Sequence, residues 1–267
     1  MSIQNIKVGA LEYLTAENIA APHCFTTRLG GVSRGHLAAM NIGTHRGDAP
    51  ESVLRNYAIL GKAIGFSPEK LVLTRQKHTD IILQVGAAQW GAGLTAPELE
   101  ECDGLITNVP GTALTVFTAD CTPILFYDPV TGAVGAAHAG WRGTAAGIGA
   151  KTVRGMVEAF GCRPSDIRAA IGPNIGQCCF QTDDDVPRAM YEALGKEAAP
   201  YIRQMEDKYY VNLKALNARI LRDAGVNEIE ISSECTFCSG ERFWSHRRNG
   251  PMRGSQGGII VCKEARV

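Results

Sequence analysis

Short apolar runs separated by turn residues predict that much of this chain is β-strand. Such runs, rich in Val, Ile, Leu and Phe and bounded by Gly, Pro, Asn or Asp, are typical of strands. A first strand near His23 runs into a loop punctuated by Gly30-Gly31. The later predicted strands fall at 71–73, 81–85, 104–107, 113–118, 123–128, 133–138, 167–172, 229–231 and 258–262.

Apolar residues at helical spacing predict four helices between these strands. The first is expected to begin with Asp48 as N-cap, with Pro50 in its opening turn. The four predicted helices span 48–65, 143–160, 183–195 and 212–224.

The order of these elements indicates one α+β domain over residues 1–267. No linker, repeat or low-complexity segment divides the chain. The strands are too numerous for one open sheet with helices on both sides. We therefore expect two packed mixed β-sheets flanked by helices.

Composition narrows the class of partner. Of 267 residues, 45% are hydrophobic, enough for a sizeable core, and 27 Lys+Arg balance 27 Asp+Glu. Without net charge, neither nucleic acid nor an anionic membrane is an expected partner. The start of the chain does not resemble a signal peptide, and no apolar stretch reaches the ~20 residues of a membrane span. Nine cysteines in so large a chain then favour a reduced, cytoplasmic protein.

His138 falls at the end of a predicted strand, and Cys121 and His78 each lie in a turn between two predicted strands. A thiolate and two imidazoles could supply three metal ligands and leave a fourth position open, as catalytic zinc requires; copper is the less favoured metal. Alternatively, Cys121 is a nucleophile activated by His138 or His78. Asp120 is a candidate general base, or the carboxylate that orients a histidine, unless it merely stabilises a turn.

Several arginines are candidates for binding an anion such as phosphate. Arg142 follows a glycine-rich turn at the start of a predicted helix, where anions are favoured. Arg28 lies in the first glycine-rich loop, and Arg247-Arg248 form a basic pair. The alternative is that they form surface ion pairs or a solvated face.

Two cysteine pairs have no clear place in this chemistry. Cys235 and Cys238 have the two-residue gap of a metal knuckle, but only the adjacent Cys178-Cys179 could match them. Because adjacent cysteines are poor chelators, we expect a structural role, with a second metal as the alternative.

Taken together, these motifs resemble one bacterial family nearly end to end. The family is known as multicopper polyphenol oxidases, or laccase-domain proteins, and is also linked with purine nucleoside phosphorylase activity and a peptidoglycan editing factor. The matching segments are 25–33, 40–43, 76–78, 118–124, 137–143, 171–176, 235–236 and 245–248.

The resemblance implies that His78, Cys121 and His138 bind zinc in a fold similar to cysteine-hydrolase toxin domains. It also implies phosphorolysis of adenosine, inosine and methylthioadenosine, with adenosine deamination. Asp120, Cys121 and Arg142 are then the expected catalytic residues. The expected substrate and phosphate ligands are Arg28, Asn41, Gln76, Arg247 and Arg248.

Other functions remain open: a cysteine or metal hydrolase acting on peptidoglycan precursors, and a zinc-stabilised interaction protein without activity. A laccase mechanism is disfavoured, because its additional copper cluster needs many more imidazoles than six histidines supply. The chain departs from the family at Thr79, Phe180, Trp244 and His246, which bears on substrate preference and leaves the expected metal ligands intact.

Overall fold

Two six-stranded sheets lie face to face in the computed structural model, which describes residues 3–263. The first sheet has the order β1-β2-β3-β15-β7-β4 and is antiparallel except for the β4–β7 pair. Its strands are β1 (Gln4–Val8), β2 (Leu11–Thr15), β3 (His23–Thr26), β4 (Leu71–Leu73), β7 (Ala113–Thr118) and β15 (Gln256–Val261).

The second sheet has the order β14-β10-β8-β9-β6-β5, with parallel pairs at both edges. The predicted hairpin at 123–138 is confirmed, since β8 and β9 are antiparallel neighbours. The strands are β5 (Ile82–Gln84), β6 (Gly104–Thr107), β8 (Thr122–Tyr127), β9 (Val134–Ala139), β10 (Arg168–Ile171) and β14 (Glu228–Ile231).

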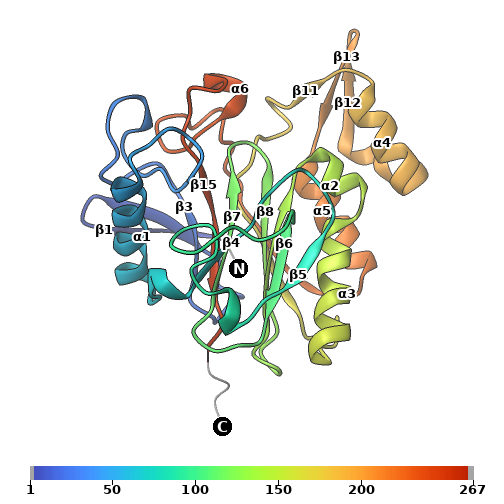
Figure 1. Cartoon of the computed structure of the whole chain (residues 1–267). Helices are drawn as coiled ribbons and strands as arrows, with labels where there is room; N and C mark the ends of the chain where they lie inside the picture. Colours follow the sequence, from blue (N-terminus) through green and yellow to red (C-terminus); the bar gives the residue numbers. More distant parts are fainter. Residues whose placement is uncertain (1–2, 264–267) are drawn as a thin grey trace.

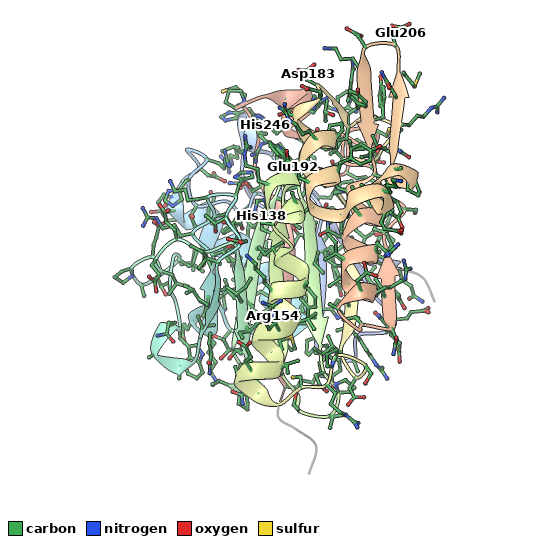
Figure 2. All side chains as sticks on the ribbon, turned by 90° about the vertical axis from the view of Figure 1, so that its right-hand side faces the viewer. His138, Arg154, Asp183, Glu192, Glu206 and His246 are labelled. Atoms are coloured by element: carbon green, nitrogen blue, oxygen red, sulfur yellow. The ribbon has the colours of Figure 1, made fainter. Side chains whose placement is uncertain are left out.

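A third, three-stranded sheet was not predicted from the sequence. It comprises β11 (Gln181–Thr182), β12 (Ile202–Met205) and β13 (Lys208–Val211). Figure 2 shows the β12–β13 hairpin projecting from the molecule, with Glu206 at its tip. Most of its side chains are at least partly exposed, so it carries no long apolar run that would mark a strand.

Helices cover the outer faces of both large sheets (Figure 1). Helix α1 (Pro50–Ile64) packs on the first sheet, and α3 (Ile148–Phe160) and α5 (Leu213–Asp223) pack on the second. The predicted helix at 143–160 is in fact two, because Gly147 is left-handed (φ 73°) after α2 (Trp141–Ala145). Helices α4 (Asp185–Leu194) and α6 (His246–Asn249) complete the set.

The main core lies between the sheets and confirms the predicted α+β architecture. Phe25 and Val116 of the first sheet meet Leu125 and Ala136 of the second there. Because helices bury the outer faces as well, the central strands are apolar on both sides. Among the described residues, no helix combines the length and apolar character needed to cross a membrane.

Candidate active site and metal centre

Three chain segments meet where connections pass from one large sheet to the other. His78 lies in the connection from β4 to β5, which joins edge strands of the two sheets. Cys121 lies in the tight turn from β7 to β8, which also changes sheet. His138, next to the end of β9, pairs with Pro123 of β8. The fold thus brings together three side chains that are far apart in sequence.

The three side chains are spaced for a shared metal ion. Their ligand atoms all lie within 4.8 Å of one another, and the Sγ atom of Cys121 is 3.8 Å from Nε2 of His78. The two imidazole rings are nearly perpendicular, at 79°. Ligands of a tetrahedral zinc stand about 3.6 Å apart for one sulfur and one nitrogen. The donor set therefore fits three ligands of such a metal, with one position open.

Asp103, which the sequence reasoning missed, fixes the orientation of this site. Its Oδ1 atom lies 2.7 Å from Nδ1 of His138. The same carboxylate accepts hydrogen bonds from the backbone N–H groups of Lys77, His78 and Thr79. One buried group thus positions both histidines, as carboxylates beside metal-binding histidines do. No local motif marks it, because it stands 35 residues from His138.

The charges of Asp103, Cys121 and His138 depend on one another. Burial raises the pKa of Asp103, but its hydrogen bonds to His138 and the backbone lower it to about 2. Burial also opposes charge on Cys121, yet the neighbouring His138 and His78 lower its pKa to about 6. Burial disfavours the His138 imidazolium, whereas Cys121 and Asp103 raise its pKa to about 9. Without a metal, Cys121 and His138 therefore form a thiolate–imidazolium pair near neutral pH.

Backbone geometry holds the ligands close. His78 (φ 62°) and Asp120 (φ 90°) adopt the left-handed region, which non-glycine residues rarely occupy. Gly140 leaves room for the metal ligands, since a Cβ atom there would lie 2.9 Å from the His78 ring and 3.2 Å from the Cys121 sulfur. Strained residues of this kind cluster at functional sites.

Asp120 faces the site but does not orient a histidine; Asp103 has that place. The Oδ1 atom of Asp120 accepts a hydrogen bond from the Thr236 hydroxyl, and its Oδ2 atom accepts one from the Arg247 backbone N–H, both at 2.7 Å. The carboxylate is thereby held at the wall of a cavity beside Cys121 and His78, where it can exchange a proton with a bound molecule.

A cavity of about 320 Å³ opens beside Cys121 and His78. Ile175 and Phe180 form an apolar part of its wall, and Asp120 a polar part. The remaining lining side chains are Ala119, His246, Arg247 and Arg253. Both His138 and His246 are labelled in Figure 2 and lie in its upper half. A neighbouring cavity of about 390 Å³ is larger and polar, but none of the three metal-ligand candidates lines it.

Two arginines that the sequence did not single out stand between these cavities. Arg253 Nη1 and Arg46 Nε approach the Ser255 hydroxyl at 3.4 Å and 3.3 Å. Burial lowers the pKa of Arg253 to about 10 and also lowers that of Arg46. Within residues 3–263, neither guanidinium is within ion-pairing distance of a carboxylate. Arg253, which is partly buried, and Arg46, which is exposed, are therefore cations without a carboxylate partner, and such groups favour an anionic ligand.

The other predicted arginines are placed differently. Arg247 lines the 320 Å³ cavity and donates to the carbonyl of Gln181. Arg28, Arg142 and Arg248 lie outside that lining, and their guanidinium groups stack over the aromatic rings of Trp244, Trp141 and Phe237.

Asn41 and Gln76 are bound to neighbouring loops. Asn41 is fully buried. Its amide NH₂ group donates a hydrogen bond to the Asp48 carboxylate, and its amide oxygen accepts one from the Ser255 backbone N–H. Gln76 bridges to the backbone of Phe117 in β7 and lines the larger cavity. Neither side chain lines the 320 Å³ cavity beside Cys121 and His78.

The fold and site together define a class: two packed sheets flanked by helices, with a His-Cys-His centre where the chain crosses between them. Residues 22–263 match the family described as "Multi-copper polyphenol oxidoreductase laccase", and the chain belongs to this family.

Its relatives carry a different activity in their names. A purine nucleoside phosphorylase of Deinococcus radiodurans is 38% identical over 94% of this chain and 92% of its own. Purine nucleoside phosphorylase YlmD of Bacillus subtilis is 36% identical over 90% of this chain and 88% of its own. The crystal structure of YlmD from Geobacillus stearothermophilus superposes with a TM-score of 0.92 at 36% identity, covering 97% and 99% of the two chains. The crystal structure of Bacillus licheniformis hypothetical protein YfiH superposes with a TM-score of 0.91 at 33% identity, covering 98% of this chain and 99% of that one.

Proposed function

We propose that this protein is a zinc-dependent purine nucleoside phosphorylase. It would convert adenosine, inosine or methylthioadenosine and phosphate into the free base and the ribose 1-phosphate. The names of its relatives support the reaction. The observation that supports the proposal most strongly is a single cavity beside the His78, Cys121 and His138 cluster. Its wall also contains Asp120, Arg247 and Arg253.

The reaction defines what each group must do. A phosphate oxygen forms a bond to C1′ of the ribose, while the bond from C1′ to the purine N9 breaks and the purine takes up a proton. Arg253 and Arg247, with Arg46 beside them, hold the phosphate. Asp120 holds the proton at the departing purine. Phe180 and Ile175 offer an apolar surface for the base.

In this proposal the metal is held by His78, Cys121 and His138. Asp103 fixes both histidines through its hydrogen bonds to the His78 backbone N–H and to the His138 ring. When bound, zinc supplies a Lewis acid at the cavity wall. The same site suits adenosine deamination, in which water replaces the amino group at the purine C6. Asp120 then takes the proton of the water and delivers it to the departing ammonia.

A cytoplasmic location is part of this proposal. All nine cysteines are free, as expected in a reducing compartment.

The test is a panel of nucleosides with and without phosphate, on protein of defined metal content, with the products identified. Cys121→Ala is expected to abolish ribose 1-phosphate formation. Arg253→Ala is expected to raise KM for phosphate roughly 10–100-fold, because a charge-assisted hydrogen bond is lost. Arg203→Ala, on the exposed strand β12, is the control. Wild-type rates in Cys121→Ala would rule out the proposal.

A second candidate is a cysteine hydrolase or amidase acting on peptidoglycan precursors. The observation that favours it is the alignment of a Cys121 thiolate, His138 and Asp103, which is the order of a nucleophile, its base and the orienting carboxylate. Hydrolysis that survives removal of the metal but not alkylation of Cys121 would select this candidate. A laccase mechanism remains disfavoured, because one His-Cys-His cluster is the only histidine-containing metal-ligand group among residues 3–263.

A further inference from the structure

Four cysteines outside the candidate active site come together behind its wall. Cys178 and Cys179 lie in the turn before β11, and Cys235 and Cys238 in the turn after β14. Their Sγ atoms all lie within 4.8 Å of one another, although Cys178 and Cys238 are 60 residues apart. The pairing of adjacent cysteines with a two-residue knuckle, weak in the sequence, is thus produced by the fold.

The sulfur spacing fits four ligands around one ion. The Sγ atom of Cys238 is 3.7 Å from that of Cys178 and 3.4 Å from that of Cys179. In a tetrahedral zinc–thiolate site the sulfurs stand about 3.8 Å apart, since each zinc–sulfur bond is about 2.3 Å. A disulfide requires about 2.05 Å between two sulfurs and gives no reason for four to converge.

Backbone hydrogen bonds close both turns that carry the cysteines. The Cys179 N–H donates to the Gly176 carbonyl and the Ser239 N–H to the Cys235 carbonyl, which curls each turn around its cysteines. The Gly176 N–H also donates to the Cys235 sulfur at 3.2 Å. A Cβ atom at Gly176 would lie 3.2 Å from the Cβ atom of Cys235 in the other turn, so the closeness of the two turns depends on glycine.

The local charges agree with a cation at the centre. Burial, together with Cys235 and Cys238, raises the pKa of Cys178 to about 11, and burial raises the pKa of Cys179 further. Burial acts against ionisation of Cys235 too, but backbone N–H groups lower its pKa. Close thiols resist joint ionisation unless a cation binds them. Four thiolates around one divalent ion leave a net charge of −2, which the buried Lys214 partly offsets where it donates to the Ser232 and Glu234 carbonyls.

We propose that Cys178, Cys179, Cys235 and Cys238 bind one thiophilic divalent cation of the zinc class as a structural site. On binding, the thiols that are still protonated release their protons, and four sulfur–metal bonds form. This site is separate from the His78 centre and does not depend on the proposed function.

The site would brace the wall of the candidate active site. Thr236, next to Cys235, donates to the Asp120 carboxylate, and its own N–H donates to the Asn174 carbonyl. Arg247 Nη1 reaches the Cys179 carbonyl at 3.5 Å. An ion that joins the two turns therefore fixes the residues that hold Asp120 and Arg247.

The experiment is metal analysis of the full chain, purified under reducing conditions, with parallel Co²⁺ loading to record sulfur-to-cobalt charge-transfer bands. The wild type is expected to bind about two ions, Cys238→Ser and Cys179→Ser about one, and His78→Ala about one. The charge-transfer bands should fall more in Cys238→Ser than in His78→Ala. Cys162→Ser, a buried cysteine elsewhere, should retain two ions.

Two results would overturn the proposal. The first is a single ion in the wild type that is lost in His78→Ala but kept in Cys238→Ser. The second is a disulfide among the four cysteines in the reduced preparation, seen by peptide mass spectrometry. If Cys238→Ser does not fold, thiol accessibility in the wild type decides: alkylation of the four cysteines must be blocked by the metal and restored by a chelator.

Discussion

Asp103 is the residue on which the geometry of the candidate metal centre depends most. It is fully buried and accepts bonds from His138 and from three successive backbone N–H groups around His78. Its carboxylate also favours the tautomer of His138 that leaves Nε2 free to bind a metal.

Asp103→Asn should weaken metal binding about 10–100-fold, because the amide cannot match the carboxylate on His138 and on the backbone. Competition with a chromogenic chelator measures the affinity. Asp80→Asn, a partly exposed carboxylate of the same connection that pairs with Lys151, is the matched control. An unchanged affinity in Asp103→Asn would show that His138 needs no such support.

Cys121 should be unusually reactive in the metal-free protein. Its pKa is lowered to about 6, so the thiolate predominates above that pH and is lost as the pH falls through it. Alkylation by iodoacetamide at Cys121, followed by peptide mass spectrometry, should therefore show a midpoint near pH 6. In His138→Gln the midpoint should move upward, because the imidazolium that stabilises the thiolate is gone; the same midpoint in both proteins would contradict this assignment.

At the scale of elements, contacts made by the turns and loops differ most from what the local sequence predicts. Helix α1 was expected to be capped by Asp48, and this was wrong: its N-cap is Ala49, without a side-chain cap. The Asp48 carboxylate instead accepts hydrogen bonds from Ser33 and Asn41, which tie the first glycine-rich loop to the helix start. The Asp48 carboxylate, which the local sequence predicted to cap the helix, therefore makes tertiary hydrogen bonds instead.

The Gly140 turn between β9 and α2 should tolerate no side chain. Gly140→Ala is expected to displace His78 and Cys121, whose atoms lie 2.9 Å and 3.2 Å from the added Cβ. Metal affinity should fall while the circular dichroism spectrum is unchanged. Gly86→Ala, where a Cβ makes only an ordinary contact with Val109, is the control. Full metal affinity in Gly140→Ala would mean that the ligands have more room than the structure shows.

At the scale of the whole molecule, the two large sheets share one core, so they should unfold together. Leu125 of β8 is fully buried in that core. Leu125→Ala should lower the free energy of unfolding by about 2–5 kcal/mol, through lost burial and the cavity left behind. Urea denaturation measures the change.

For comparison, Val130→Ala, with the side chain 68% exposed, should change the free energy of unfolding by no more than roughly 0.5 kcal/mol. Two separate transitions in the wild type would show that the sheets do not form one cooperative unit.

The sequence by itself determined the α+β class, most strands, the β8–β9 hairpin and the candidates His78, Cys121 and His138. These follow from local signals: apolar periodicity, turn residues and chemically distinctive side chains at strand ends. Family membership followed from the same motifs taken together.

Only the tertiary structure decided which distant groups meet. Asp103, Arg46 and Arg253 carry no local signal, because their partners lie on other strands and loops. The four clustered cysteines likewise come from two turns on separate elements. Their meeting depends on how the sheets pack and where the chain crosses between them, and a pattern read along one segment does not contain that geometry.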